Sequence, residues 1–260
     1  MAIGPFFGHE TPFFVVTSTG KGCDPRPCIE SVKSQTYPYY RHRYIGADMK
    51  TAAEAVVWAG PRTSVDHSPL TVVENVYRYW QTLRDSDVVV WLDGDDRLEH
   101  PGVLEFLARI YRERDPWLTY GSFRFEPPQE EAYPHFGMRY QLGADVRGWQ
   151  WRASHLKTFR AGLVKRVREE SLRRLPANHI GPVPPEEGWT EYCTDRVFML
   201  PMLEMAGERY EAIPEVLSVY NFGASFSATN RDPEKTAAEE TERRRIHSLP
   251  KYERLKERPW

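Results

Sequence analysis

The sequence predicts a mostly parallel α/β fold in which helices flank a central Rossmann-like sheet. Short apolar runs alternate with helical periodicities over the first 125 residues, the pattern that parallel strands joined by crossover helices require. A length of 260 residues suits one large α/β unit, or a core with an appendage, at about 150 residues per domain. A hydrophobic fraction of 40% and a charged fraction of 28% exclude disordered, collagen-like and coiled-coil chains.

The elements of the first half follow one another in order. A buried apolar strand opens the chain at residues 13–19 and runs into a loop rich in Gly and Pro. The clearest strand, residues 87–92, is a continuous apolar run that ends in an acidic turn. Pro101 then stands in the first-turn position that proline favours in helices. We expect further strands at 40–47 and 117–125, and helices at 27–35, 51–58, 71–83 and 102–112.

The alternation stops in the second half. Residues 126–150 are rich in Pro, Gly and aromatic residues, which indicates a long connection over a site. A helix at 194–206 is terminated by Gly207 and interrupted by Pro201, which should kink it. Two short strands are expected at 210–213 and 216–220. The tail, residues 231–260, is charged and helical in propensity, with little apolar content to anchor it.

Charge and cysteine content narrow the functional classes. Thirty-five Lys and Arg against 37 Asp and Glu leave a formal charge of -2, so no global positive field indicates a nucleic acid or an anionic membrane as partner. Three scattered cysteines are too few for a disulfide framework or a complete zinc site. Neither a secretory leader nor a membrane-spanning apolar run is evident. These features predict a soluble cytoplasmic protein.

Three carboxylates stand at the end of the strand at 87–92: Asp93, Asp95 and Asp96. Open α/β sheets bind ligands beyond the carboxyl ends of their strands. Three such charges within four residues repel one another unless a cation joins them, and Mg²⁺ and Mn²⁺ prefer oxygen ligands. We therefore predict a divalent-metal site. The alternative is a solvated turn in which Asp96 caps the next helix.

The order of three motifs resembles a known family. Residues 28–38 read CIESVKSQTYP, residues 44–48 read YIGAD, and residues 90–96 read VWLDGDD. From about residue 13 to residue 220, the chain resembles a family 2 glycosyltransferase with the GT-A fold. The resemblance implies a single GT-A domain over residues 1–230, followed by the charged helical tail. Its nucleotide-sugar and metal half would be residues 1–125, and its acceptor half residues 126–230.

The resemblance also implies a set of donor-binding residues. The loop after the first strand and the Asp ending the second hold the nucleotide, which indicates Thr17, Ser18, Thr19 and Asp48. Asn75 falls in the helix before the acidic turn, where the family often has a polar residue facing the nucleotide. The alternatives are a polar strand end for the hydroxyl residues, a helix N-cap for Asp48 and an exposed helix position for Asn75.

The implied reaction transfers a sugar from a nucleotide-sugar, most simply a UDP-sugar, with inversion at the anomeric carbon. Mn²⁺ or Mg²⁺ would stabilise the departing diphosphate. Asp95 would be the direct metal ligand, and Asp93 would face the ribose or the metal. The base that takes the acceptor proton would be Asp195 at the start of the helix at 194–206, with Glu191 in reserve. Asp195 could instead be only a helix cap.

The region between the metal motif and this base is expected to select the acceptor. Trp149, Trp151, His155 and Arg160 cluster there, and the segment SHLKTFR resembles one found beside the acceptor cleft of similar proteins. Tryptophan faces stack on sugars or bases, and Arg160 or Lys157 could bind a diphosphate or an acidic acceptor. Core filling is the alternative for the tryptophans, and a structural role for His155.

The acceptor itself stays open: a glycan, a lipid-linked sugar, a protein, a small molecule or a modified DNA base would fit. The oligomeric state is also open. Two rival functions remain, a nucleotidyltransferase on a similar sheet and a non-catalytic nucleotide-sugar binder. The first should carry a Gly-rich phosphate loop, which Gly20-Lys-Gly22 matches poorly. Retention of both Asp95 and Asp195 argues against the second.

Overall fold

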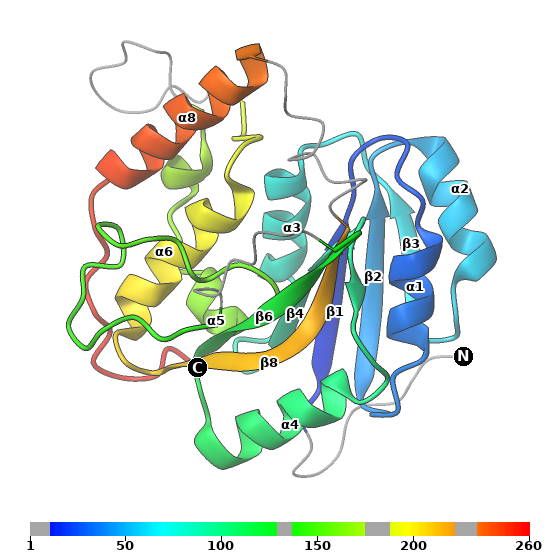
Figure 1. Cartoon of the computed structure of the whole chain (residues 1–260), viewed down its shortest axis with the longest axis horizontal. Helices are drawn as coiled ribbons and strands as arrows, with labels where there is room; N and C mark the ends of the chain where they lie inside the picture. Colours follow the sequence, from blue (N-terminus) through cyan, green and yellow to red (C-terminus); the bar gives the residue numbers. More distant parts are fainter. Residues whose placement is uncertain (1–10, 129–136, 175–187, 222–232) are drawn as a thin grey trace.

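The computed structural model describes residues 11–128, 137–174, 188–221 and 233–260. They form a curled, mixed eight-stranded sheet with helices on both faces (Figure 1). The strand order is β3-β2-β1-β4-β7-β6-β8-β5. The strands are β1 Phe13–Ser18, β2 Tyr40–Gly46, β3 Thr63–His67, β4 Val88–Asp93, β5 Arg97–Leu98, β6 Leu118–Glu126, β7 Lys157–Arg160 and β8 Tyr210–Asn221. The helices are α1 Arg26–Lys33, α2 Met49–Trp58, α3 Val72–Gln81, α4 Val103–Arg114, α5 Ala161–Val164, α6 Thr194–Ala206 and α8 Pro233–Ser248, with a 3₁₀ turn at Glu169–Leu172.

Strands β1 to β4 form the parallel half of the sheet. Successive residues of β1 point to opposite faces: Phe13 and Val15 pack with α1 and α4, whereas Phe14 and Val16 pack with α3 and α6. The predicted strands and helices of this half are confirmed to within a few residues. The edge strand β3 was not predicted, because its sequence, TSVDH, is mostly polar and only half-buried. All four parallel strands end at one edge.

The second half of the sheet is antiparallel at its junction with the first. Strand β7 lies between β4 and β6 and runs antiparallel to both. Strand β7 lies in the segment that contains Trp149, His155 and Arg160, where no strand was predicted. The two short strands expected at residues 210–213 and 216–220 form one strand, β8. Its register against β6 shifts near Gly121 and Ser122. Helix α6 has the predicted bounds and contains Pro201.

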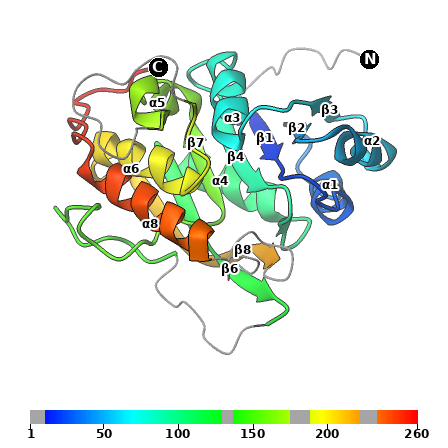
Figure 2. The same cartoon turned by 90° about the horizontal axis from the view of Figure 1, so that it is seen from above.

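The C-terminal segment is better anchored than its composition indicates. Helix α8 lies alongside α6 (Figures 1 and 2). Ile246 is 1% exposed within the core, and the terminal Trp260 packs edge-on against Trp117 at a centroid distance of 5.3 Å. The expectation of a tail with little to anchor it is therefore wrong. A few well-spaced apolar residues are enough to anchor this segment, because the rest of the fold supplies the residues they pack against. Within the described residues, no helix has the length and apolarity needed to span a bilayer.

A buried ion pair joins this segment to the body. Arg147 and Glu204 are both nearly inaccessible, with Nη2 to Oε2 at 2.9 Å. Arg147 Nη1 also donates to the carbonyl oxygens of Ile246 and Leu249 at 2.6 and 2.9 Å, and Glu204 accepts from the Tyr252 amide at 3.0 Å. One guanidinium thus satisfies backbone groups at the end of α8.

We expect Arg147→Ala to lower the free energy of unfolding by about 3–5 kcal/mol, because it leaves the Glu204 carboxylate buried without its partner. Urea unfolding measures the loss. The matched control is Lys251→Ala, which breaks the exposed Lys251–Asp145 pair and should cost less than about 1 kcal/mol. Equal losses in the two variants would contradict the anchoring role of Arg147.

Candidate active site

The acidic turn begins at the last residue of β4. Asp93 ends the strand, and Gly94 to Asp96 turn the chain at the carboxyl edge of the sheet. A Cβ on Gly94 would lie 1.9 Å from the Cγ2 atom of Thr19. Only glycine therefore lets the loop after β1 approach the acidic turn this closely. Strand register places Ser18 beside Asp93.

Two carboxylates and an imidazole converge at this edge. The His155 Nδ1 atom lies 3.1 Å from Oδ2 of Asp96 and 3.4 Å from Oδ2 of Asp93. Ligand atoms of these three residues all lie within 4.8 Å of one another. Lys157, which is 1% exposed, directs its ammonium to Asp93 Oδ2 at 3.2 Å and over the Trp91 ring at 4.4 Å. The antiparallel strand β7 thus delivers Lys157 to the acidic turn, with His155 just before it.

The three carboxyls of the acidic turn differ in the direction and cause of their pKa shifts. Burial would raise the pKa of Asp93, but Lys157 and then His155 together hold that pKa below its ordinary value. Burial and then the Asp93 charge raise the pKa of Asp95 to about 6. Burial, Asp95 and Asp93 raise the pKa of Asp96 well above its ordinary value. Burial, followed by Lys157, lowers the pKa of His155 to about 3, so the imidazole is neutral at pH 7.

These residues fit a divalent cation. Asp96 Oδ2 is buried and has no hydrogen-bond partner among the described residues, although Asp96 Oδ1 accepts from the Asn221 amide at 2.9 Å. Two carboxylates and a neutral imidazole are ligands that divalent cations accept in proteins. The group that converges is Asp93, Asp96 and His155, whereas the sequence favoured the pair Asp93 and Asp95. Asp95 as a ligand stays a prediction, and the reading of Asp96 as a cap of the next helix is wrong.

The raised pKa of Asp95 predicts a pH-dependent stability. A folded pKa of about 6 against about 4 unfolded means that the ionised carboxylate destabilises the metal-free fold above pH 6. That cost disappears as the pH falls from about 6 to about 4, because the folded state then binds the extra proton. With EDTA present and at about pH 8, Asp95→Asn should stabilise the protein by about 1–2 kcal/mol after allowance for screening.

Urea unfolding of the wild type and this variant at about pH 8 and about pH 5 checks the effect, which should shrink at the lower pH. Glu54→Gln, which alters an exposed carboxyl of α2, is the control. A stability difference between Asp95→Asn and the wild type that is the same at both pH values would contradict the assignment.

The hydroxyl residues after β1 are not equivalent. Thr17 is fully buried, and its Oγ1 lies 3.1 Å from Nε2 of His42. Its side chain therefore belongs to the core, and nucleotide binding by Thr17 stays a prediction. Ser18 and Thr19 lie beside the acidic turn, and the buried Ser18 Oγ has no hydrogen-bond partner among the described residues. Nucleotide binding by Ser18 and Thr19 stays a prediction.

Asp48 and Asn75 both hold local backbone. Asp48 caps α2 through the Thr51 amide at 2.8 Å and also accepts from the Gly22 amide at 3.0 Å. These hydrogen bonds, the Thr51 amide first, lower the pKa of Asp48 to about 2. Asn75 is buried rather than exposed and donates to the Leu70 carbonyl at 3.1 Å. Asp48 therefore holds the loop after β1 through the Gly22 amide. Nucleotide contacts by Asp48 and by Asn75 stay predictions.

Asp195 lies in the first turn of α6, and both of its carboxylate oxygens are engaged. Oδ2 accepts from the indole Nε1 of Trp151 at 3.0 Å, and Oδ1 accepts from the Arg196 amide at 2.7 Å. The N-cap of α6 is Cys193. The carboxylate is thus held by a segment outside its own helix, an interaction beyond what a helix cap requires.

The predicted acceptor residues have different surroundings in the fold. Arg160 pairs in register with Val88, at the opposite end of β4 from Asp93, and bonds to the Ser86 carbonyl and to Asp115. Arg160 thus lies far along β4 from the acidic turn, and its binding of a diphosphate or an acidic acceptor stays a prediction. Trp149 packs against the core beneath the Arg152 guanidinium. Glu191 is half-exposed and paired with Arg174.

Sequence reasoning missed the neighbours of His155. The rings of Phe123 and Tyr220, from β6 and β8, lie 5.2 and 5.0 Å from the imidazole. No sequence motif marks these two positions, since the pairing of β6 with β8 is what brings them together. His155 was expected in the acceptor region, and its ring lies beside Asp93 and Asp96; an acceptor contact stays a prediction.

Comparison with known proteins gives a fold and no family. No family model and no curated protein matches the sequence. Among solved structures, residues 1–349 of TarS from S. aureus superpose with a TM-score of 0.56 at 11% identity, covering 81% of this chain and 60% of that one. The mannosyltransferase PcManGT from Pyrobaculum calidifontis, solved with GDP-Man and Mn²⁺, gives 0.53 at 14%, covering 86% and 62%.

Glucosyl-3-phosphoglycerate synthase from Mycobacterium tuberculosis, solved with phosphoglyceric acid, gives a TM-score of 0.53 at 15% identity, covering 93% of this chain and 81% of that one. The chain has the GT-A fold. It spans about 60% of the TarS fragment's length. The predicted fold class is therefore confirmed.

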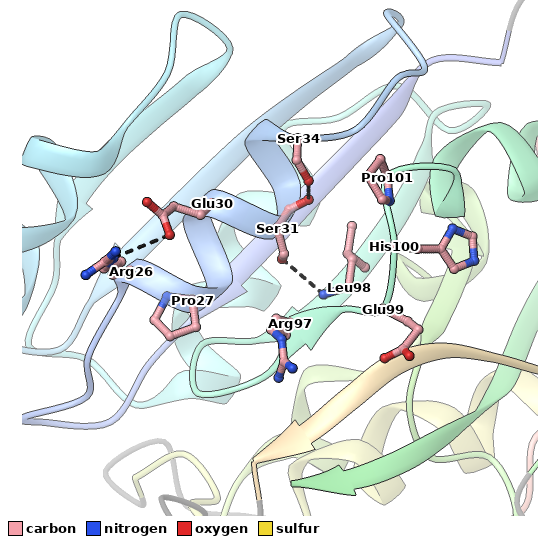
Figure 3. A pocket seen from close by; sticks show the side chains of 10 residues that line it. All are labelled: Arg26, Pro27, Glu30, Ser31, Ser34, Arg97, Leu98, Glu99, His100 and Pro101. Carbon is pink, nitrogen blue, oxygen red and sulfur yellow. Dashed lines mark hydrogen bonds and ion pairs between the residues drawn. The ribbon is translucent and has the colours of Figure 1, made fainter.

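A surface pocket is lined in part by residues that follow the acidic turn. A hollow of about 390 Å³ lies between α1 and the segment that follows the acidic turn (Figure 3). Its charged side chains are paired, Arg26 with Glu30 and Arg97 with Glu126, and the Ser31 hydroxyl accepts from the Leu98 amide. Its polar groups serve the packing of α1 on β5, and we assign it no part in the site.

Proposed function

We propose that the protein is a metal-dependent, inverting glycosyltransferase that moves a sugar from a UDP-sugar to an acceptor hydroxyl. The observation that carries the proposal is the convergence of Asp93, Asp96 and His155 at the carboxyl edge of a GT-A sheet. Structures of the same fold support it, since TarS has been solved with UDP and with UDP-GlcNAc, and PcManGT with GDP-Man and Mn²⁺.

One short segment connects the metal cluster to the proposed base. Trp151 holds Asp195, and His155, four residues later, reaches Asp93 and Asp96. Four residues span at most about 14 Å between Cα atoms. The base and the metal cluster are thereby tied to one stretch of backbone, which supports a shared site between them.

Asp93, Asp96 and His155 would hold the cation, with Asp95 as a further predicted ligand. When bound, the cation supplies Lewis-acid stabilisation of the diphosphate leaving group. Lys157 adds a fixed positive charge to the same edge. Its burial keeps this charge in a site of low dielectric, where it acts more strongly than in water.

In the transfer step, the acceptor hydroxyl oxygen bonds to the anomeric carbon of the sugar. The bond from that carbon to the diphosphate oxygen breaks, and the electron pair leaves with the nucleotide diphosphate. Asp195 takes the proton that the acceptor hydroxyl loses. Attack opposite to the departing diphosphate inverts the anomeric centre.

A donor panel tests the proposal. UDP-, GDP- and dTDP-sugars are incubated with the protein and either Mn²⁺ or EDTA, and release of nucleoside diphosphate is measured. We expect slow hydrolysis of a UDP-sugar that EDTA abolishes. Transfer is then sought by mass spectrometry of acceptor mixtures. No turnover of any donor, together with no thermal shift by UDP and Mn²⁺, would overturn the proposal.

A further inference from the structure

Trp151 and Asp195 form a side-chain pair between two segments that are far apart in sequence. The indole Nε1 donates to Asp195 Oδ2 at 3.0 Å. The Arg196 guanidinium lies over the Trp151 ring at 5.1 Å from its centroid, and the Arg196 amide donates to the other carboxylate oxygen at 2.7 Å. Both side chains are half-buried. The ring edge is thus committed to the carboxylate, and Arg196 lies over one ring face.

These contacts change the role expected for Trp151. A tryptophan that stacks on an acceptor needs an accessible face, whereas here one face lies beneath Arg196. The indole N–H is a donor without acceptor capacity. It can hold a carboxylate but cannot take a proton. The residue is therefore suited to orient Asp195.

We propose that Trp151 is the positioning residue of the proposed base: its indole N–H fixes the Asp195 carboxylate for proton transfer from the acceptor. This inference rests on the proposed function. A single hydrogen bond holds Oδ2 from outside α6, while Oδ1 is held by the backbone of the next residue. Together they leave the carboxylate in one orientation. Since a base acts only within hydrogen-bond reach of the proton it accepts, loss of this orientation should slow the chemical step.

The segment that contains Trp151 also reaches the donor side of the proposed site. Trp151 lies four residues before His155, which contacts Asp93 and Asp96, and six before the buried Lys157. The backbone that aims the base therefore also contributes to the cation cluster. Trp151 thus links the acceptor side of the proposed site to its donor side.

The test replaces the N–H while keeping the ring. Trp151→Phe, and incorporation of the isosteric benzothienylalanine at position 151, both remove the donor. We expect kcat for transfer to fall about 10-fold or more, with KM for the donor and the Tm shift by UDP and Mn²⁺ unchanged. A purely structural tryptophan would lower Tm and leave kcat unchanged at temperatures well below Tm.

The matched control is Trp58→Phe, which alters a half-buried tryptophan of α2 that also lies beneath an arginine, Arg26. It should leave kcat unchanged. If the wild type transfers sugar and the benzothienylalanine protein matches it in kcat, the role of Trp151 is wrong. If the wild type turns over no donor, the proposed function fails instead. The isosteric residue keeps the test valid where Trp151→Phe does not fold.

Discussion

Asp195→Asn should lower kcat for sugar transfer by about 10²–10⁴-fold, the usual contribution of a general base. The amide has the shape of the carboxylate but cannot accept the proton. Its oxygen can still accept from the Trp151 indole, which occupies Oδ2 in the native protein. We therefore expect the fold and the affinity for UDP with Mn²⁺ to be retained. Transfer kinetics and calorimetric titration with UDP measure the two properties separately.

The control for this variant is Glu208→Gln, which changes an exposed carboxyl just beyond the end of α6 and should leave kcat unchanged. Two outcomes would contradict the assignment of Asp195. An unfolded variant would mean that the carboxylate serves the start of α6. An active variant would mean that the base lies elsewhere, with Glu191 the next residue to test. Loss of transfer with intact UDP binding would also exclude a non-catalytic nucleotide-sugar binder.

Asp96→Asn should weaken Mn²⁺ binding by more than about 100-fold, a greater loss than removal of an outer-shell partner causes. Asp96 Oδ2 is one of the buried oxygens without a hydrogen-bond partner in the described part of the chain, and it lies 3.1 Å from His155 Nδ1. Asparagine can still accept from the Asn221 amide through its oxygen, as Asp96 Oδ1 does. The variant should therefore remain folded. Titration of free Mn²⁺ by electron paramagnetic resonance measures the affinity.

Asp66→Asn is the matched control, because Asp66 is a partly exposed carboxyl on β3 paired with Arg43. Its Mn²⁺ affinity should equal that of the wild type. If Asp95→Asn loses more affinity than Asp96→Asn, the pair Asp93 and Asp95 favoured by the sequence is the better description. If none of these carboxyl variants changes Mn²⁺ binding, the cation site is wrong.

The parallel half of the fold was predictable because its signals are local. Strand β4 is a continuous apolar run, and Thr71, whose side chain accepts from the Glu74 amide, caps α3 in the way a sequence can reveal. Strand β3 escaped prediction because an edge strand needs little apolar content. Strand β7 has only four residues, and its place in the sheet depends on pairing with β4 and β6, which no local pattern encodes.

The acidic turn of the site was predictable from the sequence, whereas the residues that contact this turn were less predictable. Asp93, Asp95 and Asp96 follow a strand in sequence, so their common location needs no tertiary information. His155 and Lys157 reach them only through the antiparallel β7. The surroundings of Thr17 and Arg160 were not predictable for a related reason: the neighbours that a strand residue meets depend on sheet register.

The central claim is that Asp93, Asp96 and His155 bind a divalent cation that takes part in holding a nucleotide diphosphate. Anomalous diffraction from crystals grown with UDP and Mn²⁺ tests it most directly. We predict a manganese peak within bonding distance of carboxylate oxygens of Asp93 and Asp96 and of a His155 ring nitrogen, about 2.0–2.3 Å away, with the diphosphate on the same ion. UDP bound elsewhere, or bound at this edge with no manganese peak, would contradict the account.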